Sequence, residues 1–93
     1  MSETFEWDAA KAAENFAKHG VSFDTAARVF SDPFGVERLD DREDYGEERF
    51  ILIGTVAEVV LTVVYTERNG RIRIISARRA TRHEQDDYFK ENH

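Results

Sequence analysis

Two stretches in the second half of the chain, residues 49–53 and 58–65, are dominated by β-branched and aromatic residues. Such side chains pack well on a pleated, partly buried surface, so both stretches favour strands. The four residues between them have the length of a hairpin connection. Further on, Asn69-Gly70 is a pair that accepts positive φ in a two-residue turn, and it predicts a second hairpin leading into a last strand over residues 71–78. These segments predict an antiparallel meander.

The first third of the chain repeats its apolar residues at helical spacing. Asp8 is a suitable N-cap for a first helix, and Gly20 is a suitable left-handed residue to end it. A second short helix follows Ser22 and ends before Pro33, because proline disfavours a helical residue in front of it. Both helices are rich in small residues. The apolar stripe of the first helix consists of Ala9, Ala12, Ala13, Phe16 and Ala17.

The two ends of the chain complete the predicted fold. Thr81 and Glu84 match a capping box, which predicts a third helix near the C-terminus. Residues 5–7 and 35–39 are weaker strand candidates. The predicted fold class is α+β, with two N-terminal helices packed on an antiparallel β-meander of about four strands, plus a C-terminal helix. Ninety-three residues fit one hydrophobic core, so we expect a single domain over residues 1–93.

In the predicted last strand, strict alternation sorts the side chains onto two faces of the sheet. One face is apolar at its start, whereas the other starts with basic residues. The first face holds Ile72, Ile74, Ser76 and Arg78, and the second holds Arg71, Arg73, Ile75 and Ala77.

Six of the ten arginines lie between Arg68 and Arg82, in a chain whose net charge is −6. A guanidinium group is a planar fork that binds phosphate oxygens in pairs and stays charged at any cellular pH, so the cluster suits a phosphodiester ligand. Two other interpretations remain open. In the first, the arginines are solvated surface charges that pair with the acidic loop of residues 40–48. In the second, they bind a partner protein with an acidic surface.

Composition and spacing exclude several classes of site. The chain has no cysteine, which excludes disulfides, thiolate metal sites and cysteine nucleophiles. It carries no HExxH motif, no histidine pair at ligand spacing, no phosphate-binding glycine loop and no GxSxG motif, so no metal or nucleotide cofactor is expected. No apolar run approaches the length of a membrane span, and we expect a soluble protein of the cytoplasm.

Two predicted helices carry side chains that are able to transfer a proton. Lys18 and His19 stand in the last turn of the first helix, where the helix dipole stabilises cations. His19 and His83 are the two imidazoles away from the chain end, so proton transfer near neutral pH by an imidazole needs one of them. Glu84 and Tyr88 lie four residues apart on one helix face, where they either cap and anchor the helix or contact a substrate.

Several short motifs are specific when they are taken together and in order. They are Phe5-Glu6-Trp7-Asp8, Lys11 with Asn15, Lys18-His19-Gly20-Val21 with Phe23, Gly46-Glu47 with Arg49, and Arg73-Ile74-Ile75-Ser76-Ala77-Arg78 with Ala80. With these motifs, from Phe5 to about Tyr88, the chain resembles the BrnT family of type II toxins. The resemblance implies a RelE-like fold and a metal-independent ribonuclease that blocks translation by cutting RNA. It also implies a BrnA-like antitoxin, which masks the RNA surface and carries the segment through which the complex contacts DNA.

The resemblance and the chemistry of RNA cleavage together define the candidate site. Attack of a 2′-hydroxyl on the adjacent phosphorus needs a base, cations around the developing phosphorane and an acid for the leaving oxygen. No metal ligands are expected, and removal of one catalytic arginine is expected to slow cleavage about 10²-fold or more. The candidate catalytic residues are Arg49, Arg73, Arg78, His19 and Tyr88, and the candidate RNA-binding residues are Lys18, Arg71, Arg79, Arg82 and Glu84.

A function of a different class fits the same residues. The chain is a non-catalytic interaction module, or a decayed toxin, if its arginine-rich face only binds an acidic partner. A DNA-binding subunit is disfavoured because no predicted helix concentrates basic residues. The nuclease interpretation requires the guanidinium groups to converge on one accessible hollow that fits a single sugar-phosphate link.

Overall fold

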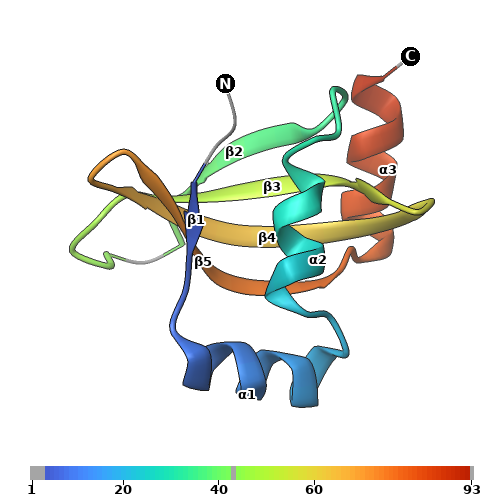
Figure 1. Ribbon diagram of the computed structural model, residues 1–93. Helices are drawn as coiled ribbons and strands as arrows, with labels where there is room; N and C mark the ends of the chain where they lie inside the picture. Colours follow the sequence, from blue (N-terminus) through green and yellow to red (C-terminus); the bar gives the residue numbers. More distant parts are fainter. Residues whose placement is uncertain (1–3, 43, 93) are drawn as a thin grey trace.

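The computed structural model of the protein describes residues 4–42 and 44–92. Within these residues the chain forms three helices and a five-stranded sheet in the order β1-β5-β4-β3-β2 (Figure 1). The α+β class is confirmed, although the strand count is five because the short N-terminal strand joins the sheet. The elements are β1 (Phe5–Glu6), α1 (Ala9–His19), α2 (Phe23–Val29), β2 (Val36–Asp40), β3 (Arg49–Val56), β4 (Val59–Arg68), β5 (Arg71–Arg79) and α3 (Arg82–Glu91).

The sheet is antiparallel from β2 to β5, as the meander predicts. β1 is the exception, because it pairs with the outer edge of β5 in the parallel direction, with Phe5 opposite Ile72 and Glu6 opposite Arg73. The first and the last strand along the chain are therefore neighbours in the sheet, and they bring the N-terminal segment beside the arginine-rich strand.

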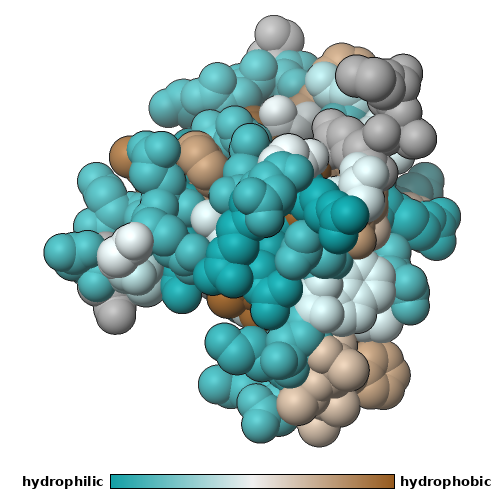
Figure 2. All heavy atoms as spheres, turned by 60° about the vertical axis from the view of Figure 1, so that its left-hand side comes forward, coloured by the Kyte–Doolittle hydropathy of each residue, from teal (hydrophilic) through white to brown (hydrophobic). Residues whose placement is uncertain are grey.

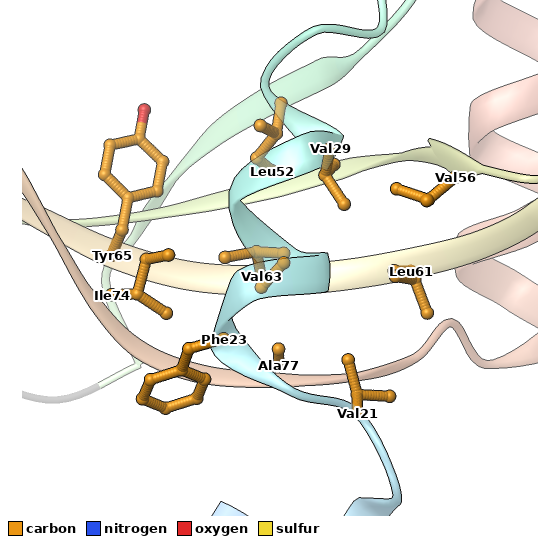
Figure 3. Close-up of a cluster of buried hydrophobic side chains, with 11 residues drawn as sticks. Val21, Phe23, Val29, Leu52, Val56, Leu61, Val63, Tyr65, Ile74 and Ala77 are labelled. Carbon is orange, nitrogen blue, oxygen red and sulfur yellow. The ribbon is translucent and has the colours of Figure 1, made fainter. Parts of the chain in front are cut away.

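β4 is the central strand, and its residues from Val60 to Thr66 are all buried. α2 lies across one face of the sheet and covers the larger apolar core (Figure 3). α3 lies on the opposite side of the sheet, near one end of the strands (Figure 1). The larger core contains Val21, Phe23, Ala26, Val29, Leu52, Val56, Leu61, Val63, Tyr65, Ile74 and Ala77, and the smaller core under α3 contains Ile53, Val60, Ala80 and Tyr88.

The turn between β3 and β4 differs from the prediction. The sequence suggests a connection over residues 54–57, but the strands run on and only Ala57 and Glu58 form the turn, with φ values of 49° and 69°. Gly54 lies inside β3 instead, and a Cβ atom there would come within 2.9 Å of a methyl group of Val29. The glycine therefore permits the close approach of α2 to the sheet, and it does not mark a turn.

A β-bulge changes the alternation of side chains along β5. Val64 of β4 pairs with Ser76, whereas the next residue, Tyr65, pairs with Ile74, so Ile75 is the extra residue. Strict alternation is therefore wrong beyond Ile74, because an extra residue reverses the phase of all the residues that follow it. Ile74 and Ala77 consequently both face the larger core.

The predicted signals for the ends of the helices are confirmed. The side chains of Asp8, Ser22 and Thr81 each accept a hydrogen bond from the backbone N–H three residues further on. Gly20 adopts φ of 70° and ends α1 in the left-handed conformation. Local chemistry therefore fixes where the three helices begin, independently of what they pack against.

α1 lies along the outer edge of β5, and Asn15 connects the two elements (Figure 1). The Asn15 amide donates to the carbonyl oxygens of Ala77 at 2.8 Å and Val21 at 3.0 Å, and its oxygen accepts from the Ala77 N–H at 3.1 Å. β1 pairs with β5 only as far as Arg73. The buried Asn15 side chain thus satisfies edge groups of β5 that a longer β1 would otherwise pair.

The apolar stripe of α1 is mostly turned towards solvent. Ala9, Ala13 and Ala17 are exposed, and 55% of Phe16 is accessible. In Figure 2 hydrophobic residues gather at the lower end of the molecule, at the height of α1, whereas most of the remaining visible surface is hydrophilic. α1 therefore attaches to the sheet through a polar side chain, which periodicity alone does not predict.

We expect Asn15→Ala to lower the free energy of unfolding by about 3 kcal/mol, because it leaves three buried backbone groups without partners at roughly 1 kcal/mol or more each. Urea denaturation followed by circular dichroism measures this loss. Glu14→Ala, an exposed change on the same helix, is the control and should stay within about 0.5 kcal/mol of the unmodified protein. Equal midpoints for Asn15→Ala and the unmodified protein would contradict the edge-closing role.

Candidate nucleic-acid interface

A row of charged and polar residues crosses all five strands of the sheet. Asp40 of β2 pairs with Arg49 of β3, and Arg73 of β5 pairs with both Thr66 of β4 and Glu6 of β1. Phe50 of β3 pairs with Tyr65 of β4 in the antiparallel direction. Arg49 precedes Phe50 and Thr66 follows Tyr65, so Arg49 and Thr66 are also neighbours. Two arginines therefore flank a buried threonine, with a carboxylate at each end of the row.

This row lies on the same face of the sheet as α3. α3 covers the opposite end of that face and does not reach the row. Ile53 of β3 packs with Tyr88 of α3, and Arg49 precedes Ile53 by four residues, so both side chains project from the same face. The same spacing relates Thr62, which bonds to α3, to Thr66. The arginines of the row thus occupy the part of this face that no helix covers.

A small hollow of about 110 Å³ lies between these arginines and the start of α1. Its walls carry four cationic and two anionic side chains, so the local charge is positive in a protein whose net charge is −6. We call it hollow one. It is lined by Asp8, Lys11, Glu47, Arg49, Arg68, Arg73, Ile74 and Ile75.

Arg49 is held in hollow one mainly by an aromatic ring and a nearby carboxylate. Its guanidinium carbon lies 4.0 Å from the centre of the Tyr45 ring, and its Nε lies 3.5 Å from a carboxylate oxygen of Glu47. That Nε is shielded from solvent, and within the described part of the chain it has no hydrogen-bond partner. Cation–π stacking and charge position the group, and its terminal Nη groups donate no hydrogen bond to a described residue, so they are the donors that a ligand could use.

Glu47 is the carboxylate between two guanidinium groups of hollow one. Arg68 donates to it at 2.9 Å, and Arg49 approaches it from the other side. The hydrogen bond from Arg68 lowers the pKa of Glu47 against the opposing effect of desolvation, and the charges of both arginines add to the lowering. Glu47 is therefore held in its ionised form between the two guanidinium groups.

Arg73 and Lys11 supply the remaining cations of hollow one. Arg73 donates one hydrogen bond, from Nη1 to Glu6 at 2.8 Å, which leaves its other N–H groups without a partner among residues 4–42 and 44–92. The ammonium group of Lys11 forms no ion pair with any described residue. The hollow thus retains donors that the fold itself does not use.

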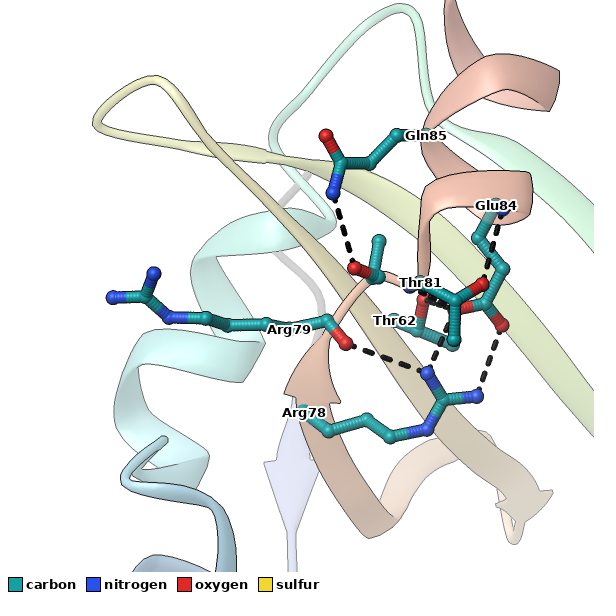
Figure 4. A network of polar contacts seen from close by, with 7 residues as sticks. Thr62, Arg78, Arg79, Thr81, Glu84 and Gln85 are labelled. Carbon is teal, nitrogen blue, oxygen red and sulfur yellow. Dashed lines mark hydrogen bonds and ion pairs between the residues drawn. The ribbon is translucent and has the colours of Figure 1, made fainter.

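Arg78 lies on the same face as Arg73 but belongs to a different cluster, at the start of α3 (Figure 4). Its guanidinium donates to both oxygens of Glu84, at 2.7 and 2.9 Å. Glu84 also accepts from the Thr62 hydroxyl and the Thr81 N–H. Burial opposes ionisation of Glu84, but the bonds from Arg78, Thr81 and Thr62 outweigh it and lower the pKa to about 2. The pair joins α3 to the sheet.

Tyr88 is 6% exposed and lies away from hollow one. Its hydroxyl donates to Asp32 at 2.6 Å, and the same carboxylate accepts from the N–H and hydroxyl of Thr55. Burial and the ionised Asp32 raise the pKa of Tyr88. This contact fixes α3 against β3 and the segment after α2, as an anchor does.

The other candidate residues are distributed over the surface. Arg71 and Arg79 are exposed at the two ends of β5, and Arg82 is exposed on α3 near Asp86. Lys18 and His19 line a separate hollow of about 300 Å³, here called hollow two. Arg49 and Arg73 therefore converge, but the expected convergence of all the guanidinium groups does not occur. Hollow two is lined by Lys11, Glu14, Asn15, Lys18, His19, Ile75 and Ser76.

Sequence reasoning assigned no site role to three residues of hollow one. Arg68 counted only as part of the arginine cluster, and Glu47 and Lys11 counted only as parts of motifs. Lys11 and Lys18 are seven residues apart, a spacing that puts both on one face of a helix. This spacing could have shown that the two lysines line one surface of α1. No sequence signal marks the bulge that puts Arg73 and Arg78 on one face.

Among residues 4–42 and 44–92, no group of three or more histidine, aspartate or glutamate side chains is arranged to hold a metal ion. No helix in the described part of the chain has the length and apolarity needed to cross a bilayer.

The chain is thus a small α+β protein with a guanidinium-lined hollow, and guanidinium groups suit an anion such as a phosphodiester. A family model described as the ribonuclease toxin BrnT of a type II toxin-antitoxin system matches residues 7–84. The chain belongs to this family of ribonuclease toxins, which implies an RNA substrate and an antitoxin partner. The match includes every residue that lines the two hollows. No curated protein matches the chain.

We expect Glu84→Gln to lower the free energy of unfolding at pH 7 by about 1 to 3 kcal/mol, because it weakens charged hydrogen bonds to Arg78. The folded-state pKa of about 2 lies below the ordinary 4.5, so the carboxylate stabilises the fold above pH 4.5. That contribution is lost as the pH falls from 4.5 towards 2. Urea denaturation at several pH values should show the two proteins converging over this range, and a constant difference would contradict the assignment.

Proposed function

We propose that this protein is a metal-independent endoribonuclease that blocks translation by cutting RNA, with hollow one as the place where the scissile phosphate binds. One observation carries the proposal. Arg49 and Arg73 flank Thr66 on an uncovered sheet face, and each keeps terminal guanidinium N–H groups that no described residue occupies. Preorganised donors of this kind stabilise a phosphorane more than they stabilise the substrate.

The proposed reaction uses the RNA's own 2′-hydroxyl as the nucleophile. Its oxygen forms a bond to the adjacent phosphorus as its proton passes to a base, and the bond from phosphorus to the 5′-oxygen breaks. The leaving 5′-oxygen takes a proton from an acid, so the products are a 2′,3′-cyclic phosphate and a 5′-hydroxyl. Arg49 and Arg73 neutralise the extra negative charge of the phosphorane.

We assign the base to Glu47, since it is the ionised carboxylate between the guanidinium groups of hollow one. Arg68 then holds this carboxylate in position, and Lys11 contributes charge beside the phosphate. His19, the expected acid, lines hollow two and lies eight residues, or about 12 Å, along α1 from Lys11, so we assign no side chain to the acid. Arg78 and Tyr88 fit a structural role better than a catalytic one, because Glu84 and Asp32 occupy them.

The proposed partner is a BrnA-like antitoxin, which binds this protein in the cytoplasm, masks the RNA surface and carries the only contact of the complex with DNA. Support comes from membership of a type II toxin-antitoxin family. Co-expression is the direct check of this part, because a reading frame that encodes such an antitoxin should relieve the growth arrest that the toxin alone causes.

We expect Arg49→Ala and Arg73→Ala each to slow RNA cleavage by about 10²-fold or more, because each removes preorganised donors from the transition state. Purified protein without antitoxin is incubated with RNA in excess chelator, and the initial rates are measured on a gel. The matched control is Arg28→Ala, which removes an exposed arginine of α2 outside hollow one and should cleave at the unmodified rate.

Three results would oppose the proposal. Loss of all activity in chelator would reject metal independence, and equal rates for Arg73→Ala and Arg28→Ala would reject hollow one as the site. If the unmodified protein binds an acidic partner but cuts no RNA, the non-catalytic interaction module is the correct function.

A further inference from the structure

We infer that hollow two is a subsite for the nucleotide next to the scissile phosphate, so that the substrate is single-stranded RNA bound along the groove between α1 and β5. This inference rests on the proposed function of hollow one. Lys11 and Ile75 line both hollows, so the two are adjacent and share a wall. A strand whose phosphate occupies hollow one therefore passes Lys11 as it leaves.

The charges of hollow two suit an RNA backbone. Lys11 and Lys18 lie seven residues apart on one face of α1, which is about 10 Å along the helix axis. Neither ammonium group forms an ion pair with a described residue. Glu14 lies between them on the helix and offsets part of their charge. The remaining excess is positive, in contrast to the protein as a whole.

The rest of hollow two offers contacts for the sugar or the base. The Ser76 hydroxyl is half-buried in β5 and has no hydrogen-bond partner among the described residues, so it is available to a ribose hydroxyl. His19 presents a partly exposed imidazole ring, on which a base is able to stack. Asn15 lines hollow two but has no amide group left to bind a ligand, because its amide is already bonded to the backbone of Val21 and Ala77.

The β-bulge explains why the two hollows adjoin. Ile75 is the extra residue of β5, and it lies between the arginine that lines hollow one, Arg73, and Ser76 of hollow two. Bulges redirect side chains beside functional sites. A strand without the bulge would present alternating residues here, and Ser76 would project from the opposite face. The groove is therefore a consequence of this one irregularity.

The groove favours one unpaired strand over a duplex. Hollow one is small, at about 110 Å³, and the groove continues from it beside a single helix. Proteins that bind single strands commonly combine a cationic track for the backbone with rings on which bases stack. Lys11, Lys18 and His19 supply these two components.

The test measures binding separately from cleavage. A fluorescent hexanucleotide with 2′-O-methyl groups cannot be cut, and its affinity is followed by anisotropy over a range of salt concentrations. We expect Lys18→Ala to reduce the slope of log K against log salt by about 0.7, the value for one lost phosphate contact on a single strand. Lys90→Ala, an exposed lysine of α3, should leave the slope unchanged. Glu14→Gln should bind more tightly than the unmodified protein.

Cleavage assays then separate the two levels of the proposal. With an unmethylated hexanucleotide, Lys18→Ala should raise KM and leave kcat unchanged, whereas Lys90→Ala should leave both constants unchanged. An unchanged salt slope in a protein that still cuts RNA would reject the subsite alone. If the unmodified protein binds the hexanucleotide through Lys18 but cuts no RNA, the function proposed for hollow one is wrong. Equal slopes for Lys18→Ala and Lys90→Ala would also overturn the inference.

Discussion

The burial of β4 on both faces is the constraint on which the remaining structure depends. Its residues from Val60 to Thr66 are all buried, so each face of the sheet needs a cover. α2 provides it on one face, whereas α3 reaches only one end of the other. The uncovered end cannot be apolar without exposing hydrophobic surface to water. Arginines held by carboxylates occupy it instead, and the space beside them is hollow one.

A single extra residue, Ile75, decides how the arginines of β5 are arranged. Because of the bulge, Arg73 and Arg78 project from the same face although five residues separate them. Their surroundings nevertheless differ. Arg78 is bonded to both oxygens of Glu84 and stabilises the position of α3, whereas Arg73 forms one side-chain hydrogen bond with the residues that the structure describes. One arginine of β5, Arg78, thus stabilises the fold at one end of the strand, and another, Arg73, lines hollow one at the other end.

Local chemistry was sufficient to predict the helix caps at Asp8 and Thr81 and the turn at Asn69-Gly70, because each depends on residues a few positions apart. The predictions failed where partners came from elsewhere in the chain. Gly54 suggested a turn, but it faces α2. Arg78 was predicted to be catalytic from its motif, and the sequence did not show that Glu84 binds two of its guanidinium nitrogens. Arg49 and Arg73 were identified from motifs, but their proximity depends on strand register.

The proposed function depends on Arg49 and Arg73 binding one RNA phosphate in hollow one. The most direct measurement follows the Nε–H signals of the arginine side chains by NMR during titration with an uncleavable RNA. The signals of Arg49 and Arg73 should move together and exchange more slowly with water, because both groups gain hydrogen bonds. The Arg78 signal should stay in place, since Glu84 keeps its guanidinium. Movement of the Arg78 signal alone, with Arg49 and Arg73 unaffected, would contradict the account.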